Sequence, residues 1–212
     1  MTAEIEYFYS VRSSFTYLGH QEVVQLARKF GRRLVHKPIL LGTVVPATGG
    51  IPFQDRHPAR LTQATQDMLR WGAHRGIPIL TEPTHHYGPM DYPAGAMAAA
   101  ILADLSQNDL DSLAFAINEA LWRYDRDIGK QEVVAAICDE HGLDGAALTA
   151  AAVQPAAKAL IQENNRDAIE RGVIGAPTYV VDDEMFYGQD RLSFVALHLE
   201  WERDHTFETP KA

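Results

Sequence analysis

The sequence is poor in cysteine, since Cys138 is the only one among 212 residues. A single thiol permits no intrachain disulfide, no CxxC redox pair and no zinc site built from several cysteines. Thiol chemistry of that kind would have to use a thiol that another molecule brings. The nine histidines show no ligand spacing, and the adjacent His85 and His86 fit a surface loop better than a pocket lining. We therefore expect no metal site.

Basic runs and long apolar segments are also missing. The formal net charge is −9, and no Lys/Arg-rich run interrupts the acidic balance, which argues against nucleic acid or an anionic membrane as a partner. No apolar run reaches the roughly 20 residues that span a bilayer, and the first residues do not resemble a secretory signal. We expect a cytoplasmic protein whose partner is a small molecule.

Strand-like runs occur near the two ends of the chain. Residues 4–11 (EIEYFYSV) and 32–41 (RRLVHKPILL) predict strands, and the helical pattern between them has a serine N-cap candidate and ends at Gly31. This order predicts a parallel β-α-β unit. Near the other end, residues 177–187 (PTYVVDDEMFY) predict a hairpin with an Asp-Asp-Glu turn.

A final helix is predicted over residues 190–204, with Leu192, Val195 and Leu199 on one face and Phe194 and Leu197 beside them. The polar tail at 205–212 is expected to be frayed.

The middle of the chain has the spacing of helices. We expect helices at 58–75, 93–106, 109–125, 130–141 and 155–171, with Asn108 or Asp109 as an N-cap and a Gly/Pro-rich loop over 42–52. A β-α-β unit and a β-β-α unit separated by helices predict an α/β, thioredoxin-like fold with a large all-helical insertion. The expected boundaries are 1–45 and 172–212 for the discontinuous thioredoxin-like domain, and 46–171 for the helical insertion domain.

The loop after the first strand is the expected site, because a helix N-terminus there directs free N–H groups and partial positive charge outward. Ser13 and Ser14 stand in this loop, where a redox enzyme would need CxxC. One interpretation is that a serine simply caps the helix. The other is that it donates a hydrogen bond to a bound thiolate. A helix terminus contributes roughly 0.3–1 kcal/mol and a hydrogen bond to a charged acceptor roughly 1.5–3 kcal/mol, which together would lower a thiol pKa by about 1–3 units.

Four stretches resemble one known family. They are IEYFYSVRSSFTYLG at the start, DMLRWGAHRGIPI at 67–79, the segment 115–144, and AIERGVIGAPTYVVDDEMFYGQDRLSFV at 168–195, which is the most specific. Together they resemble the 2-hydroxychromene-2-carboxylate isomerases, relatives of the kappa-class glutathione transferases within the DsbA-like thioredoxin superfamily. The resemblance runs nearly from end to end.

The resemblance implies a glutathione site. Aligned on the family's SPYSYL-type motif, Ser13 is the serine beside the glutathione sulfur. Pro177 corresponds to the family's cis-proline, and the backbone of Ala176 would pair with the glutathione backbone. Gln189 and Asp190, in a GNDRL-type turn, would hold the γ-glutamyl end, with Asp190 accepting from its ammonium group.

The activity that this resemblance implies is glutathione-dependent cis/trans isomerisation of an unsaturated aromatic keto acid, in a homodimer. Arg12 and Ser14 depart from the family's pattern and are candidate substrate-binding residues; Arg12 is either a partner for the substrate carboxylate or a solvated loop charge. A third departure is Ser10, where an aspartate is common.

Two other functions stay open. A kappa-type glutathione transferase would use the same serine, and a noncatalytic binder of glutathione or another small molecule would keep the fold without the chemistry. Trp71, Trp122 and Tyr124 fit either an aromatic pocket or core packing.

Overall fold

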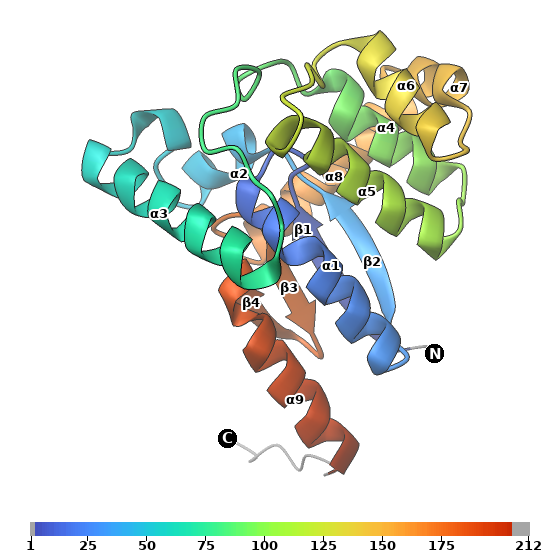
Figure 1. The fold of residues 1–212 in the computed structure, drawn as a ribbon. Coiled ribbons are helices and arrows are strands. Elements are labelled where there is room, and N and C mark those ends of the chain that lie inside the picture. Colours follow the sequence, from blue (N-terminus) through green and yellow to red (C-terminus); the bar gives the residue numbers. More distant parts are fainter. Residues whose placement is uncertain (1–2, 205–212) are drawn as a thin grey trace.

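Four strands form one mixed sheet, in the order β2-β1-β3-β4 (Figure 1). The computed structural model describes residues 3–204, and their side chains as far as residue 201. In it, β1 (Glu4–Tyr9) pairs in parallel with β2 (Arg33–Pro38) and antiparallel with β3 (Thr178–Val181), which pairs antiparallel with β4 (Glu184–Tyr187). The two ends of the chain therefore share one sheet, and the predicted β-α-β unit and hairpin are confirmed.

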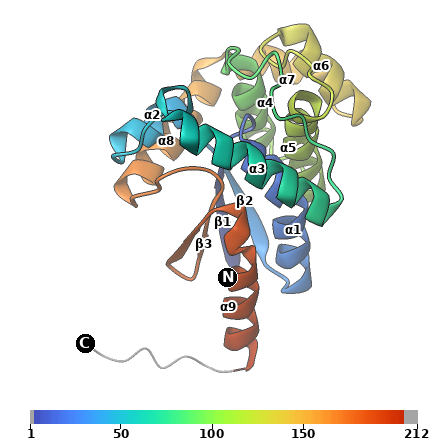
Figure 2. The same cartoon turned by 60° about the vertical axis from the view of Figure 1, so that its left-hand side comes forward.

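Helices cover both faces of this sheet, as Figure 2 shows. On one face lie α1 (Ser14–Lys29) and α9 (Leu192–Asp204), and on the other lie α2 (Leu41–Ala47) and α8 (Pro155–Glu170). The alternation of β1 explains this arrangement, because successive side chains of a strand point to opposite faces. Tyr7 and Tyr9 enter the α1 side, whereas Phe8 packs on the α8 side.

The remaining helices lie in the middle of the chain. They are α3 (Pro58–Arg75), α4 (Asp91–Leu102), α5 (Gln107–Trp122), α6 (Gln131–Glu140) and α7 (Gly145–Ala152), preceded by the 3-10 turn η1 (Phe53–Asp55). A second 3-10 turn, η2 (Gln189–Arg191), lies between β4 and α9. The thioredoxin-like plan with a large helical insertion is confirmed. None of the described helices is both long and apolar enough to cross a membrane.

Two local predictions are wrong. The N-cap of α5 is Ser106 and not Asn108 or Asp109: the Ser106 hydroxyl accepts from the Asp109 N–H at 3.2 Å and donates to the Asp109 carboxylate at 2.7 Å, so the aspartate supports the cap from inside the helix. The loop predicted over 42–52 contains most of α2. Burial of Val44 and Val45 favours that helix in spite of its glycine and proline residues.

On α9, Leu192, Val195 and Leu199 are buried as predicted, whereas Phe194 and Leu197 are more than half exposed. The helix begins at Leu192, two residues later than predicted, because η2 occupies the preceding turn. The tail at 205–212 lies outside the described residues.

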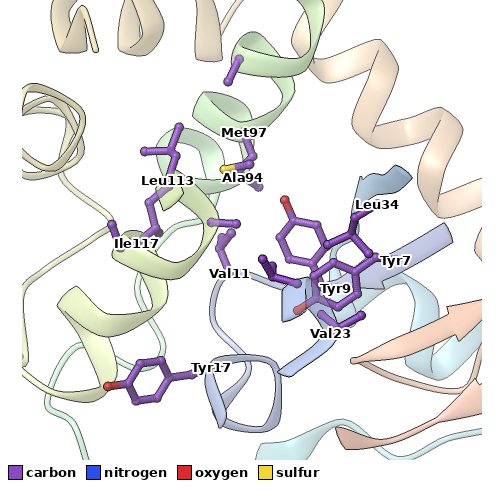
Figure 3. Packing of buried hydrophobic residues seen from close by; sticks show 14 of the residues in the cluster. Tyr7, Tyr9, Val11, Tyr17, Val23, Leu34, Ala94, Met97, Leu113 and Ile117 are labelled. Atoms are coloured by element: carbon purple, nitrogen blue, oxygen red, sulfur yellow. The ribbon is translucent and has the colours of Figure 1, made fainter. Parts of the chain in front are cut away.

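The main core continues from the sheet into the helical segment (Figure 3). Tyr7 and Tyr9 of β1 pack with Val11, and the same cluster includes Met97 of α4 and Leu113 of α5. A shared core holds the loop after β1 firmly between sheet and helices. The domain boundaries at 46–171 stay a prediction.

Candidate functional site

Ser13 occupies the N-cap of α1, immediately after β1. Its Oγ accepts from the Thr16 N–H at 3.2 Å, and the backbone of Ser13 itself is extended, as an N-cap requires. The same hydroxyl donates to the carbonyl oxygen of Ala176, also at 3.2 Å. The capping role is confirmed, and because β1 and β3 are neighbours, the loop after β1 meets the loop before β3.

Ala176 and Pro177 form the other side of this contact. Their peptide bond is cis, and Pro177 directly precedes β3, where its missing N–H interrupts no ladder. The Pro177 carbonyl accepts from the Gly188 N–H at 2.9 Å, which links this loop to the turn that carries Gln189. Within the described residues the Ala176 N–H makes no hydrogen bond. A ligand with a peptide backbone could use that donor.

Gln189 lies against α1, in the turn η2. A Cβ atom on Gly19 would stand only 2.7 Å from the Gln189 Cβ, so the glycine allows η2 to approach the helix closely. Gln189 is 2% exposed, and its Oε1 finds no hydrogen-bond partner among the described residues. Asp190 is exposed and its carboxylate pairs with Arg191 at 2.6 Å. The structure thus brings Ser13, Ala176, Pro177 and Gln189 around the first turns of α1, with Asp190 next to them in the chain.

Arg75, in the last turn of α3, fixes the position of η2 and was not anticipated. Its Nη1 donates to the Leu18 carbonyl at 2.7 Å and its Nη2 to the Gln189 carbonyl at 3.1 Å. It also pairs with Glu22 and lies over the Trp71 ring at 4.7 Å. No sequence signal distinguishes it from an ordinary basic residue at a helix C-terminus.

Arg12 fixes a second segment, the loop between α3 and α4. Its Nη1 donates to the carbonyls of His86, at 3.1 Å, and Gly88, at 2.7 Å, while the Trp122 Nε1 donates to the Arg12 carbonyl at 3.2 Å. Arg12 is half-buried and makes no ion pair with any described residue. Because Nη1 holds the loop with both hydrogens, the Nε and Nη2 hydrogens are the ones left for a ligand.

An aromatic cluster surrounds His86. Its ring lies 4.5 Å from Tyr87, 4.9 Å from Trp122 and 5.6 Å from Phe53, between centroids. Burial, helped by the charge of Arg12, lowers the pKa of His86 to about 4, so the imidazole is neutral at physiological pH.

Of the three aromatic residues singled out in the sequence, only Trp122 belongs to this cluster. Tyr124 is 57% exposed, and Trp71 packs against Arg75 and His74. Ser14, the first residue of α1, is buried, and its hydroxyl makes no hydrogen bond within the described part of the chain.

Cys138 takes no part in this site. It is buried in α6, where burial raises the pKa of its thiol to about 11. Among residues 3–204, no cluster of three or more His, Cys, Asp or Glu side chains could hold a metal ion. The Ser13 hydroxyl, at a helix N-terminus beside the backbone of Ala176, can bind and polarise the thiol of a ligand. The chain itself supplies no thiol at this place.

A comparison with protein families agrees with this geometry. The family model for the DSBA-like thioredoxin domain matches residues 4–200. The chain belongs to this family. Ser13 stands in the βα loop of this thioredoxin-like fold, after the end of β1.

Individual relatives share only about a quarter of their residues with this chain, but the similarity covers most of its length. The chain is 26% identical over 200 residues to a 2-hydroxychromene-2-carboxylate isomerase from Sphingobium xenophagum, covering 94% of this chain and 99% of the relative. It is 27% identical over 192 residues to the protein of the same name from Pseudomonas putida, covering 89% and 90%.

Two solved structures share the fold. A 2-hydroxychromene-2-carboxylate isomerase structure has a TM-score of 0.80 at 23% identity, covering 96% of this chain and 99% of the other. The cytosolic disulfide reductase DsbM of Pseudomonas aeruginosa, solved with GSH, has a TM-score of 0.64 at 17% identity, covering 93% and 99%.

Proposed function

We propose that this chain is a glutathione-dependent isomerase of a small unsaturated aromatic keto acid, similar to the 2-hydroxychromene-2-carboxylate isomerases. Three curated relatives carry that name, each matching 89% or more of this chain. One contact carries the proposal: the Ser13 hydroxyl, at the N-terminus of α1, donates to the Ala176 carbonyl beside the cis-proline.

The residues around this contact fit glutathione. Ala176 offers an unused N–H and a carbonyl to a peptide backbone. Gln189 offers a buried acceptor that lacks a donor among the described residues, and Asp190 offers a carboxylate for an ammonium group. That DsbM, a protein with the same fold, was solved with GSH supports the assignment.

Glutathione, when bound, would supply a thiolate able to add reversibly to a conjugated carbon, which turns a double bond into a rotatable single bond. The task of Ser13 is to favour the charged form of that thiol. Its one hydrogen now goes to Ala176, so donation to sulfur requires it to leave that carbonyl. The Ala176 carbonyl then becomes free to accept from the ligand backbone. The move of the Ser13 hydrogen to sulfur and the pairing of Ala176 with the ligand are therefore coupled.

Arg12 and Ser14 are proposed to bind the substrate. The Nε and Nη2 groups of Arg12 can meet a carboxylate with two parallel hydrogen bonds, while Nη1 keeps the loop in place. The Ser14 hydroxyl is a second donor at the N-terminus of α1. The resemblance also supports a cytoplasmic homodimer, which light scattering at several concentrations would check.

The pKa of the bound thiol tests the role of Ser13, measured from thiolate absorbance as the pH is varied. We expect the protein to lower it by about 1–3 units, and Ser13→Ala to abolish most of that shift and slow turnover. Ser106→Ala is the matched control, because it removes an N-cap hydroxyl from α5 with the same 3.2 Å contact, away from the site. If Ser13→Ala leaves the thiol pKa and the rate unchanged, the assignment is wrong.

Two activity measurements separate this proposal from its alternatives. Incubation with glutathione and an aryl halide would reveal a conjugate if the chain is a kappa-type transferase. Calorimetric binding of glutathione without turnover of any unsaturated keto acid would identify a noncatalytic binder. Isomer exchange without a conjugate is the result expected of an isomerase.

A further inference from the structure

His86 differs from the fully buried histidines in its hydrogen bonding. His20 and His36 each have a partner on both ring nitrogens. Neither ring nitrogen of His86 has one in the described part of the chain, although the ring is half-buried among Phe53, Tyr87 and Trp122. The His86 ring nitrogens are not among the fully buried atoms that lack a partner, so a ligand can reach them and supply the hydrogen bond that the chain does not.

The position of His86 is fixed relative to the first turn of α1. Arg12 holds the His86 carbonyl, and Trp122 bonds to the Arg12 carbonyl while its ring lies 4.9 Å from the imidazole. Arg12 directly precedes Ser13. The buried Trp122 side chain therefore contacts both the imidazole and the chain segment directly before Ser13, which places His86 beside the candidate site.

We propose that His86 is a substrate-contacting residue whose ring N–H donates a hydrogen bond to a carbonyl or phenolic oxygen of an aromatic ligand packed against Tyr87, the exposed ring of the cluster. The inference rests on the proposed function and names a contact within it. Neutral imidazole has one donor and one acceptor, which suits a substrate that carries both hydroxyl and carbonyl groups. Any negative charge that the bound oxygen gains during the reaction would be stabilised by this N–H.

The surroundings keep the ring neutral. Arg12, on the loop after β1, disfavours a second positive charge, and the phenol of Tyr87 is the nearest titratable neighbour on the same loop. The segment at η1 contributes Phe53, over which Arg56 lies at 5.6 Å. Burial and the positive charge of Arg12 therefore disfavour imidazolium, and hydrogen-bond donation should not depend on pH between about 5 and 8.

The test is a titration with 2-hydroxycinnamate, a conjugated phenolic acid, in the absence of glutathione, followed by NMR of the histidine rings. We expect the His86 ring signals to shift on binding. His86→Phe keeps a ring in the cluster but lacks the N–H, and should weaken binding about tenfold. His86→Gln, which restores an N–H donor, should recover most of the loss. His85→Gln is the matched control, since His85 is the adjacent residue and faces Asp127 instead.

The inference is overturned if 2-hydroxycinnamate does not bind, if the His86 signals do not move, or if His86→Phe binds as well as the unmodified chain. Because glutathione is left out, this outcome is independent of the thiol. Binding that depends on His86, combined with no glutathione-dependent turnover, would refute the proposed function and leave the contact intact.

Discussion

Two polar clusters in this molecule differ in how well they are satisfied. The first, here named the core network, consists of Tyr7, Tyr9, His20, His36 and Asp111, and joins β1, α1, β2 and α5. His36 donates to the Asp111 carboxylate at 3.0 Å and meets the Tyr9 hydroxyl at 3.1 Å, while His20 donates to the Asp111 carbonyl at 2.8 Å. The second cluster is the candidate site, where the Ala176 N–H, Gln189 Oε1 and the His86 ring have no partner among the described residues.

The buried side-chain atoms that lack a hydrogen bond show the same difference between the two clusters. The buried side-chain atoms without a hydrogen bond in the described chain are Thr16 Oγ1, Asn118 Oδ1, Tyr179 Oη and Gln189 Oε1. The Thr16 N–H donates to the capping hydroxyl of Ser13, and Tyr179 and Gln189 both lie against Gly19; only Asn118, on α5, is unrelated to the site. Satisfied polar groups hold a fold together, whereas unsatisfied ones indicate where a ligand completes it.

The comparison predicts that the core network contributes to stability and the site to binding. Asp111→Ala should give the largest effect, a loss of about 3–5 kcal/mol in the free energy of unfolding, because it leaves buried His36 on β2 without its partner and removes the partly buried hydrogen bond from Gln107 on α5. Asp67→Ala, which removes an exposed carboxylate paired with Arg70, should cost under about 0.5 kcal/mol. Urea denaturation measures both. Equal losses for the two variants would contradict the distinction.

The second-largest effect should come from acid, which should weaken the core network. Burial lowers the pKa of His20 from 6.5 to about 4, so between these values the unfolded chain binds a proton that the folded chain does not. The contribution of His20 to stability should therefore be constant above pH 6.5 and fall by roughly 3 kcal/mol as the pH decreases to 4, in addition to any contribution from His86, whose pKa is also lowered to about 4. His20→Gln should flatten part of this slope in urea melts at several pH values; an unchanged slope would show that His20 is not the titrating group.

Gln189→Leu should change stability least among the variants of buried residues and should instead weaken glutathione binding. Removing a buried acceptor that has no partner costs little stability, but it removes the group proposed to meet the γ-glutamyl end. We expect the glutathione Kd, measured by calorimetry, to rise about tenfold, and the free energy of unfolding, measured by urea melts, to stay within about 1 kcal/mol of that of the unmodified chain. A large loss of stability with unchanged affinity would place Gln189 in the fold and not in the site.

Much of the fold and part of the candidate site could be predicted from the sequence. Local patterns were enough for the strands, for the cap at Ser13 and for the helical middle, because each depends on near neighbours. The roles of Arg75 and Arg12 could not be predicted, since both depend on carbonyl groups brought close only by the tertiary fold: Leu18 and Gln189 for Arg75, His86 and Gly88 for Arg12. The core network was missed for the same reason, because His36 and Asp111 are 75 residues apart.

A crystal structure of the chain with glutathione is the most direct test of the proposed site. We expect the sulfur within hydrogen-bonding distance of the Ser13 hydroxyl, the peptide backbone paired with Ala176, and a donor from the ligand on Gln189 Oε1. Glutathione bound elsewhere, or a sulfur directed away from Ser13 while that hydroxyl still donates to Ala176, would contradict it.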